Sequence, residues 1–322
     1  MKFNKNILKL FLKLLISAVL LTVFLYHIEL KKVFEIFSQI SVSTIILAIS
    51  VNIIAILVSG YKWKLLIPRH HYFKIILIAM IGRFYSIVLP GQIAGEGVKA
   101  WILGKGHEDA EQIAASVILD KITGVIGTLI ICILGIICSM KMIPREVTVS
   151  IILCVLLLFI ILFSLRNERF FSFINKICQY FTRFKKIEKT VNHLLKAIAE
   201  FKLYLKNPGL IFINIFAGCI YQLLAVLLIY VFSRSIQIDV GFFDYCWIFG
   251  IVTIALILPV TIAGLGVREG TFLGLLGWLG VVNEKALALS IAFLGMQLLD
   301  AIIGGAIHFT MIYNKQHTVL KK

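Results

Sequence analysis

The motif L-P-x-x-I-A-G-x-G-V-[K/R] occurs twice in this chain and limits how the polypeptide can fold. The first copy begins at Leu89 and the second at Leu258, and we call the offset between these two positions the repeat spacing. Each copy follows an apolar run, which its proline ends. A backbone break frees amide and carbonyl groups, so at membrane depth it is tolerated where protein buries it or where it lines a polar cavity. Paired breaks in two halves of a membrane chain therefore indicate a central binding site.

Composition places these breaks in a membrane protein. Hydrophobic residues make up 60% of the chain and the mean hydropathy is +1.00, whereas a soluble domain is about half apolar. We predict a single membrane domain over residues 1–322, with no sizeable soluble catalytic domain. The apolar segments are 10–28, 40–60, 75–90, 122–140, 147–165, 209–232, 244–258, 268–281 and 286–312.

The charge distribution predicts the topology. The net charge is +16, but the Lys and Arg residues lie between the spans, which is the positive-inside pattern and not a nucleic-acid interface. The most basic segment, 166–206, is therefore predicted to be cytoplasmic, together with the loop 61–74 and both termini. We expect a multi-pass protein of the plasma membrane with about six full spans.

Three apolar segments are short for a bilayer, which needs about 20 helical residues. The topology predicts that 75–90 enters from the cytoplasm, turns at Pro90 and Gly91 and returns to that side. Segments 244–258 and 268–281 would enter from outside and turn near Pro259.

The predicted fold class is an all-α polytopic membrane protein built as an inverted repeat. Each half, 1–140 and 147–312, would contain a helix, a second helix, a re-entrant hairpin and a final helix. In the alternative, the hairpins are full spans and the motif is an ordinary duplicated loop. Segment 166–206 has apolar residues at three- and four-residue steps, which predicts amphipathic helices on the inner leaflet. Its alternative is a solvated connector.

Charged side chains at membrane depth indicate a functional or structural role, because inserting each one costs about 2.5–3.5 kcal/mol of free energy on insertion scales. Lys99 and Arg268 occupy the same motif position, so each half would contribute one cation to an anionic group such as a phosphate. The motif glycines would let the backbone approach a ligand closely. The predicted substrate-binding residues are Arg83, Gln92, Glu96, Lys99, Asp120, Lys121, Arg268, Glu269 and Asp300. The predicted helix breaks are Pro90, Gly91, Gly95, Gly97, Pro259, Gly264 and Gly266.

In the alternative, these charges pair with one another, Glu96 with Lys99 and Arg268 with Glu269, and only lock the hairpins. Asp120 and Lys121 point about 100° apart on a helix and should have different partners. Asp300 would either take up a proton during transport or neutralise Arg268, and we favour neutralisation.

The sequence contains no residue pattern typical of a metal site or of nucleophilic catalysis. No His, Cys and carboxylate residues have metal-ligand spacing, and no Ser-His-Asp or Cys-His arrangement can be argued. All six cysteines lie in apolar or amphipathic stretches, as packing residues do. We therefore predict no metal and no cofactor, and we do not expect a catalytic activity.

The two motifs, with A-A-S-V-I-L-D-K-I-T-G at 114–124, resemble the lysylphosphatidylglycerol synthase transmembrane-domain family, also called flippase-like domain proteins. The resemblance covers about 10–310. The family usually has an acidic residue and an Arg where this chain has Glu96 and Lys99, and its D-R pair appears as Asp120 and Lys121. Lys lacks the bidentate fork of Arg. In the family this domain translocates aminoacylated phospholipid, and a separate soluble domain, not seen here, makes that lipid.

These observations predict a flippase-like protein that moves a lipid with a charged head group, such as a lipid-linked sugar or a modified phospholipid, between leaflets. Its partners would be anionic or lipid-linked membrane lipids and a lipid-modifying enzyme. One alternative is a membrane enzyme or subunit of lipid modification, of the phosphatidylglycerol lysyltransferase type. Another is a scaffold for inner-leaflet glycosyltransferases. An enzyme would show converging acid and base groups at one face, whereas a flippase would show a midplane site reachable from both faces.

Overall fold

The computed structural model describes residues 30–89, 92–139, 188–257, 261 and 263–320, with single positions at 149, 153, 172, 176 and 177. Throughout these residues the regular structure is helical, which confirms the predicted all-α class. The helices are α2 (Leu30–Ser38), α3 (Val42–Leu66), α4 (Tyr72–Val88), α5 (Gln92–Gly104), α6 (Ala110–Cys138), α9 (Glu188–Leu205), α10 (Pro208–Ser235), α11 (Phe242–Ile257), α12 (Val267–Trp278) and α13 (Asn283–Leu320).

Four of these helices are long and apolar enough to cross a membrane: α3, α6, α10 and the part of α13 up to Ile312. Helix α11 is apolar but shorter. This confirms a polytopic membrane protein. The predicted spans 10–28 and 147–165 lie outside the described residues, as does most of 166–187.

Helix α3 extends further than its sequence predicts. Ser41 caps its start by accepting a hydrogen bond from the Thr44 amide at 3.2 Å. Its end is Leu66, so Lys62 lies inside the helix and is buried, and the prediction of a cytoplasmic loop over 61–74 is wrong for its first residues. Burial of Lys62 is tolerated because its ammonium lies 2.8 Å from the Asp120 carboxylate.

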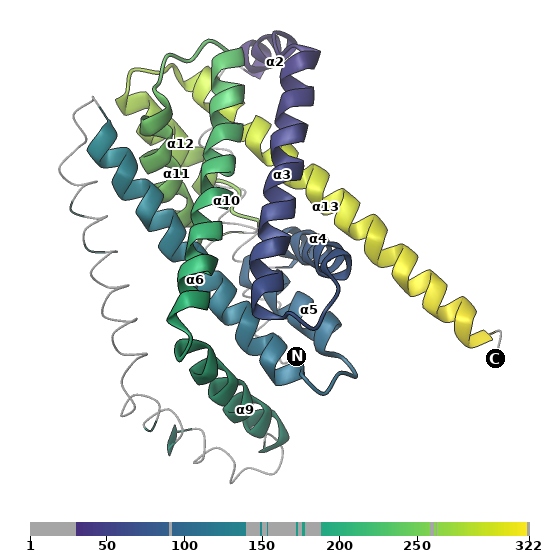
Figure 1. Cartoon of the computed structure of the whole chain (residues 1–322). Coiled ribbons are helices and arrows are strands. Elements are labelled where there is room, and N and C mark those ends of the chain that lie inside the picture. The colour runs from purple at the N-terminus through teal and green to yellow at the C-terminus, as the bar shows by residue number, and fades with distance from the viewer. Residues whose placement is uncertain are drawn as a thin grey trace, which may run out of the picture.

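The repeat spacing of the motifs also relates the helices of the two halves. The offset that carries Leu89 onto Leu258 carries Leu66, the end of α3, onto Ser235, the end of α10. The ends of α4 and α11 correspond in the same way. Helices α3 and α10 lie side by side and antiparallel, since Asn214 near the start of α10 bonds to the Lys62 carbonyl near the end of α3. The two halves are therefore inverted with respect to each other (Figure 1).

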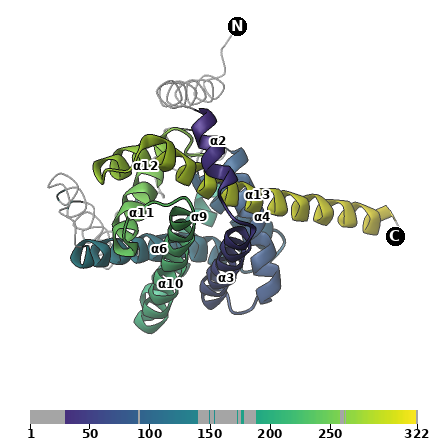
Figure 2. The same cartoon turned by 90° about the horizontal axis from the view of Figure 1, so that it is seen from above.

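Each half packs its hairpin helix on the last helix of the other half. Helix α4 packs on α13, and its counterpart α11 packs on α6. Seen from above, α6 and α13 extend away from the centre in opposite directions (Figure 2). Glycines at equivalent positions of the repeat permit both contacts: a Cβ on Gly304 would overlap the Met80 carbonyl, and one on Gly135 would overlap the Phe243 carbonyl.

Helices α4 and α5 form a tight antiparallel hairpin. Gly82 of α4 faces the Lys99 side chain of α5, and a Cβ on Gly95 would overlap Ser86 and the Gly82 carbonyl. Helices α4, α5, α11 and α12 have 17, 13, 16 and 12 residues, all below the roughly 20 needed to span a bilayer. The α4–α5 and α11–α12 pairs lie toward opposite ends of the bundle (Figure 1). The predicted turn residues Pro90, Gly91 and Pro259 are outside the described residues.

The two motif copies differ in backbone structure. In the second copy Gly264 and Gly266 have φ values of 74° and 86° and precede α12, a conformation that glycine adopts without strain. In the first copy the prediction of helix breaks at Gly95 and Gly97 is wrong, because both lie inside α5. Gly95 serves close packing against α4 instead.

Helix α9 is the described part of the predicted amphipathic segment. Its residues Phe201 and Tyr204 are buried against α6 and the end of α3, and Ala197 on the same helix is also buried. Tyr204 Oη donates a hydrogen bond to the Leu66 carbonyl at 2.7 Å. Protein therefore covers one face of α9, while docking of the segment on lipid stays a prediction.

Candidate functional site

A cavity of about 300 Å³ lies between the two halves. Its walls come from α3, α4, α5, α6, α10, α11 and α13, and from Ala263 of the second motif. It includes six of the nine predicted site residues: Arg83, Glu96, Lys99, Asp120, Lys121 and Asp300.

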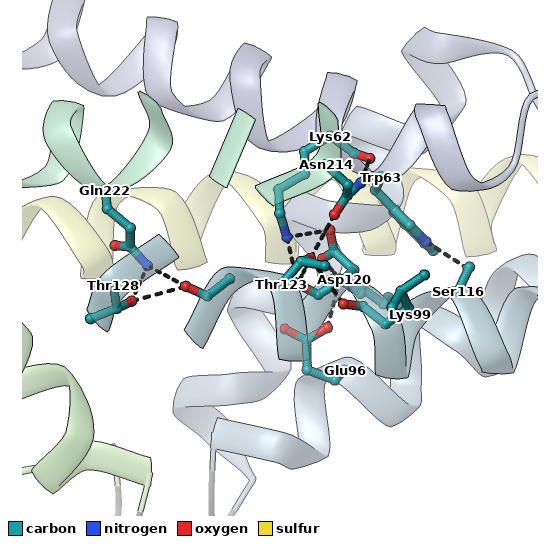
Figure 3. A network of polar contacts seen from close by, with 12 residues as sticks. Lys62, Trp63, Glu96, Lys99, Ser116, Asp120, Thr123, Thr128, Asn214 and Gln222 are labelled. Carbon is teal, nitrogen blue, oxygen red and sulfur yellow. Dashed lines mark hydrogen bonds and ion pairs between the residues drawn. The ribbon is translucent and has the colours of Figure 1, made fainter. Parts of the chain in front are cut away.

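A network of alternating charges occupies the wall formed by α3, α5 and α6 (Figure 3). Lys62 Nζ lies 2.8 Å from Asp120 Oδ1 and donates to the Asp120 carbonyl at 2.5 Å. Lys99 Nζ lies 3.4 Å from Asp120 Oδ2 and 2.5 Å from Glu96 Oε2. Lys99 also stacks over the Trp63 ring, 4.6 Å from its centroid. Opposite charges at these distances stabilise one another strongly in a low-dielectric interior.

Glycines on two helices make room for the Lys62 side chain. A Cβ on Gly218 of α10 would lie 3.3 Å from Lys62 Cε, and one on Gly124 of α6 would lie 3.6 Å from Lys62 Nζ. Asn214 holds the neighbouring backbone by donating to the Lys62 carbonyl at 2.7 Å and accepting from Thr123 Oγ1 at 2.6 Å. Lys62 therefore crosses the α6–α10 contact to reach Asp120.

A second ion pair joins the two halves across the cavity. Arg83 Nη1 of α4 donates to Asp300 Oδ2 of α13, and Asn52 Nδ2 of α3 donates to Asp300 Oδ1 at 2.7 Å. The prediction that Asp300 neutralises Arg268 is wrong, because its cation is Arg83. Gln297, which precedes Asp300 by three residues on α13, lines the same cavity.

Arg268 and Glu269 lie behind the cavity wall. Their exposed fractions are 0% and 2%, and Arg268 Nη2 lies 2.8 Å from Glu269 Oε1. Arg268 Nη1 also donates to Gln297 at 2.9 Å, and Glu269 Oε2 accepts the Gly266 amide at 2.6 Å. This geometry fixes the start of α12, whereas the equivalent cation Lys99 lines the cavity.

Lys121 differs from the other cavity cations. It lies beside Asp120 in sequence, yet among the described residues no carboxylate is within ion-pair distance of its ammonium. Asp120 has Lys62 and Lys99 as partners, while a separate partner for Lys121 stays a prediction. The Gln92 side chain lies outside what the structure describes.

Several polar residues of this wall are not among those predicted from the sequence. Lys62 is missing from the prediction because the apolar run ends before it. Helical spacing is the signal that identifies it, since Asn52, Ser59 and Lys62 share one face of α3. Gln222 of α10 is also missing from the prediction, and it donates to Thr128 Oγ1 at 2.5 Å.

The cavity charges come almost entirely from the first half. At the repeat spacing, the positions that correspond to Lys62, Arg83, Glu96 and Asp120 are Val231, Val252, Leu265 and Leu289. The pseudo-symmetric fold therefore holds an asymmetric site. No group of three or more potential metal ligands occurs among the described residues, and what the wall offers chemically is fixed charge.

Comparison with known proteins agrees with this architecture. The family model described as "Lysylphosphatidylglycerol synthase TM region" matches residues 10–304. A UPF0104 membrane protein of Pyrococcus horikoshii is 24% identical over 212 residues, which cover 60% of this chain and 63% of that protein. The chain thus matches less than two thirds of that relative's length. No solved structure matches the chain.

Proposed function

Because the chain belongs to the lysylphosphatidylglycerol synthase transmembrane-region family, we propose that it moves a lipid with a charged head group between membrane leaflets. The observation that carries this proposal is the charge-lined cavity at the contact between the two inverted halves. A charged group is costly at the bilayer centre. Fixed cations and carboxylates in the cavity replace the water that a head group loses there.

The arrangement of the halves supports movement around this cavity. In transporters built from inverted repeats, one repeat rocks against the other around a central site. Here the halves meet through α4 on α13 and α11 on α6, with glycines at both contacts. Such close backbone contacts are typical of helices that pack inside membranes.

The state of the carboxylates favours translocation over an enzymatic role. Glu96, Asp120 and Asp300 each lie against a lysine or arginine. These fixed ion pairs suit electrostatic stabilisation of a head group more than acid–base chemistry, because each carboxylate is already engaged by a cation. We place the protein in the plasma membrane with both termini cytoplasmic, and its partners are membrane lipids.

The test is lipid translocation in reconstituted vesicles. Vesicles would contain fluorescent lipid in both leaflets, and a reductant added outside would bleach only the outer leaflet unless the protein exchanges lipid. We expect wild-type protein to make most of the lipid accessible, and Arg83→Gln to slow this exchange. Arg234→Gln is the matched control, because Arg234 forms an exposed ion pair with Asp239 away from the cavity. Bleaching equal to that of empty vesicles for anionic, neutral and cationic lipids would refute translocation.

A further inference from the structure

The charges that line the cavity do not balance. Among the described residues the lining cations are Lys62, Arg83, Lys99 and Lys121, and the carboxylates are Glu96, Asp120 and Asp300. Each carboxylate lies in an ion pair with one or two of the first three cations. Lys121 is left over, so the cavity has one positive charge in excess.

An incoming anion would find the paired cations occupied. Lys99 has carboxylate oxygens at 2.5 Å and 3.4 Å, and a second anion beside them would be repelled. Lys62 is buried and bonded to Asp120. Arg83 is bound to Asp300, which also accepts from Asn52. Lys121 offers three donors without competition from a carboxylate of the described residues.

The helix face around Lys121 leaves space for a ligand. Gly124, Val125 and Thr128 follow it at three- and four-residue steps on α6 and line the same cavity. Across from them α10 contributes Gly218 and Gln222. Glycines of α6 and α10 thus line the same cavity as Lys121, and Thr128 and Gln222 add polar groups to it.

We propose that the cavity selects a lipid whose head group carries one negative charge, a phosphodiester, and that Lys121 holds this charge. This inference rests on the proposed function, since it takes the cavity to be the lipid site. One negative charge brings the cavity to neutrality. A zwitterionic or cationic head group also has a phosphate, but its ammonium leaves the positive charge of the cavity uncompensated. A phosphomonoester, with a charge near −2, leaves an excess negative charge in low dielectric.

The experiment measures lipid binding to purified protein in detergent by native mass spectrometry, without requiring translocation. The probes are phosphatidylglycerol, phosphatidylcholine, phosphatidic acid and an aminoacylated phosphatidylglycerol. Wild-type protein should prefer phosphatidylglycerol by about tenfold or more, the range expected for one hydrogen bond to a charged group. Lys121→Gln should abolish that preference, and Lys121→Arg should keep it. Lys105→Gln is the matched control, because Lys105 is exposed and stacks on Trp101.

The outcomes separate this inference from the proposed function. Phosphatidylglycerol preference that survives in a folded Lys121→Gln variant, or a wild-type preference for any other probe, overturns the inference, whatever happens in the vesicle assay. Preference without translocation supports the site and refutes the flippase. If inorganic phosphate displaces phosphatidylglycerol at similar concentration, the site serves soluble anions and the lipid assignment is wrong. If Lys121→Gln fails to fold, Lys121→Glu with reversed preference for the aminoacylated lipid supports the inference, and unchanged preference refutes it.

Discussion

Replacing Arg268 by Gln tests whether the second motif's charges lock the fold. Arg268 is fully buried and donates through three nitrogens, at 3.1 Å and 2.8 Å to Glu269 and at 2.9 Å to Gln297. In the variant, Glu269 retains the Gly266 amide as its described partner and stays buried. Stranding one member of a buried pair costs about 3–5 kcal/mol. At about 2–4 °C per kcal/mol for a chain of this order of size, the apparent Tm should fall by about 6–20 °C.

The assay is thermal unfolding of purified protein in one detergent at one scan rate. Arg268→Gln combined with Glu269→Gln removes both charges, so this double variant should recover more than half of the lost Tm. Arg234→Gln breaks an ion pair whose members are exposed, and such pairs contribute about 0–1 kcal/mol. The reasoning would be wrong if Arg268→Gln were as stable as Arg234→Gln, or if the double variant were no more stable than the single one.

The packing and the topology lead to three more testable outcomes. Gly135→Ala should lower the apparent Tm, because its Cβ would overlap α11, whereas Gly97→Ala should leave it equal or higher, since nothing lies within 4 Å of that Cβ; equal effects in unfolding scans would contradict the glycine contact. Cysteines at Lys105 and Gln237, in a protein whose native cysteines are replaced, should react with impermeant reagents from opposite faces, the first from the cytoplasm; reaction from one face would refute the inverted topology. A peptide of 166–206 should bind anionic vesicles more weakly as salt screens the charges, and equal binding to neutral vesicles in a sedimentation assay would leave only its apolar face as an anchor.

The helical class, the repeat and most of the charged residues of the cavity could be predicted from the sequence, because these depend on apolar run length, motif spacing and charge at membrane depth. The partners of those charges could not. The Arg83–Asp300 pair joins residues 217 positions apart, and no local pattern specifies which cation a distant carboxylate meets. Lys62 was misplaced for the same reason, since its burial depends on Asp120 and on glycines of two other helices.

The different structures of the two motif copies also have a physical cause. In the second copy Glu269 bonds the Gly266 amide and so caps the start of α12. The residue that corresponds to Glu269 in the first copy is Ala100, which offers no such acceptor. The first copy lacks this cap, and its helix begins before the glycines. A shared motif therefore does not imply a shared backbone when the capping residue lies outside the shared letters.

The exchange of packing partners between halves affects how this protein is made. The ribosome synthesises the first hairpin, which contains Arg83, long before it adds Asp300, 217 residues later. At synthesis rates of about 5–20 residues per second, that interval is about 10–40 s. During this interval the Arg83 guanidinium lacks its native partner Asp300, and α4 lacks the helix on which it packs, α13. The cavity therefore cannot form all its native ion pairs until α13 has been synthesised.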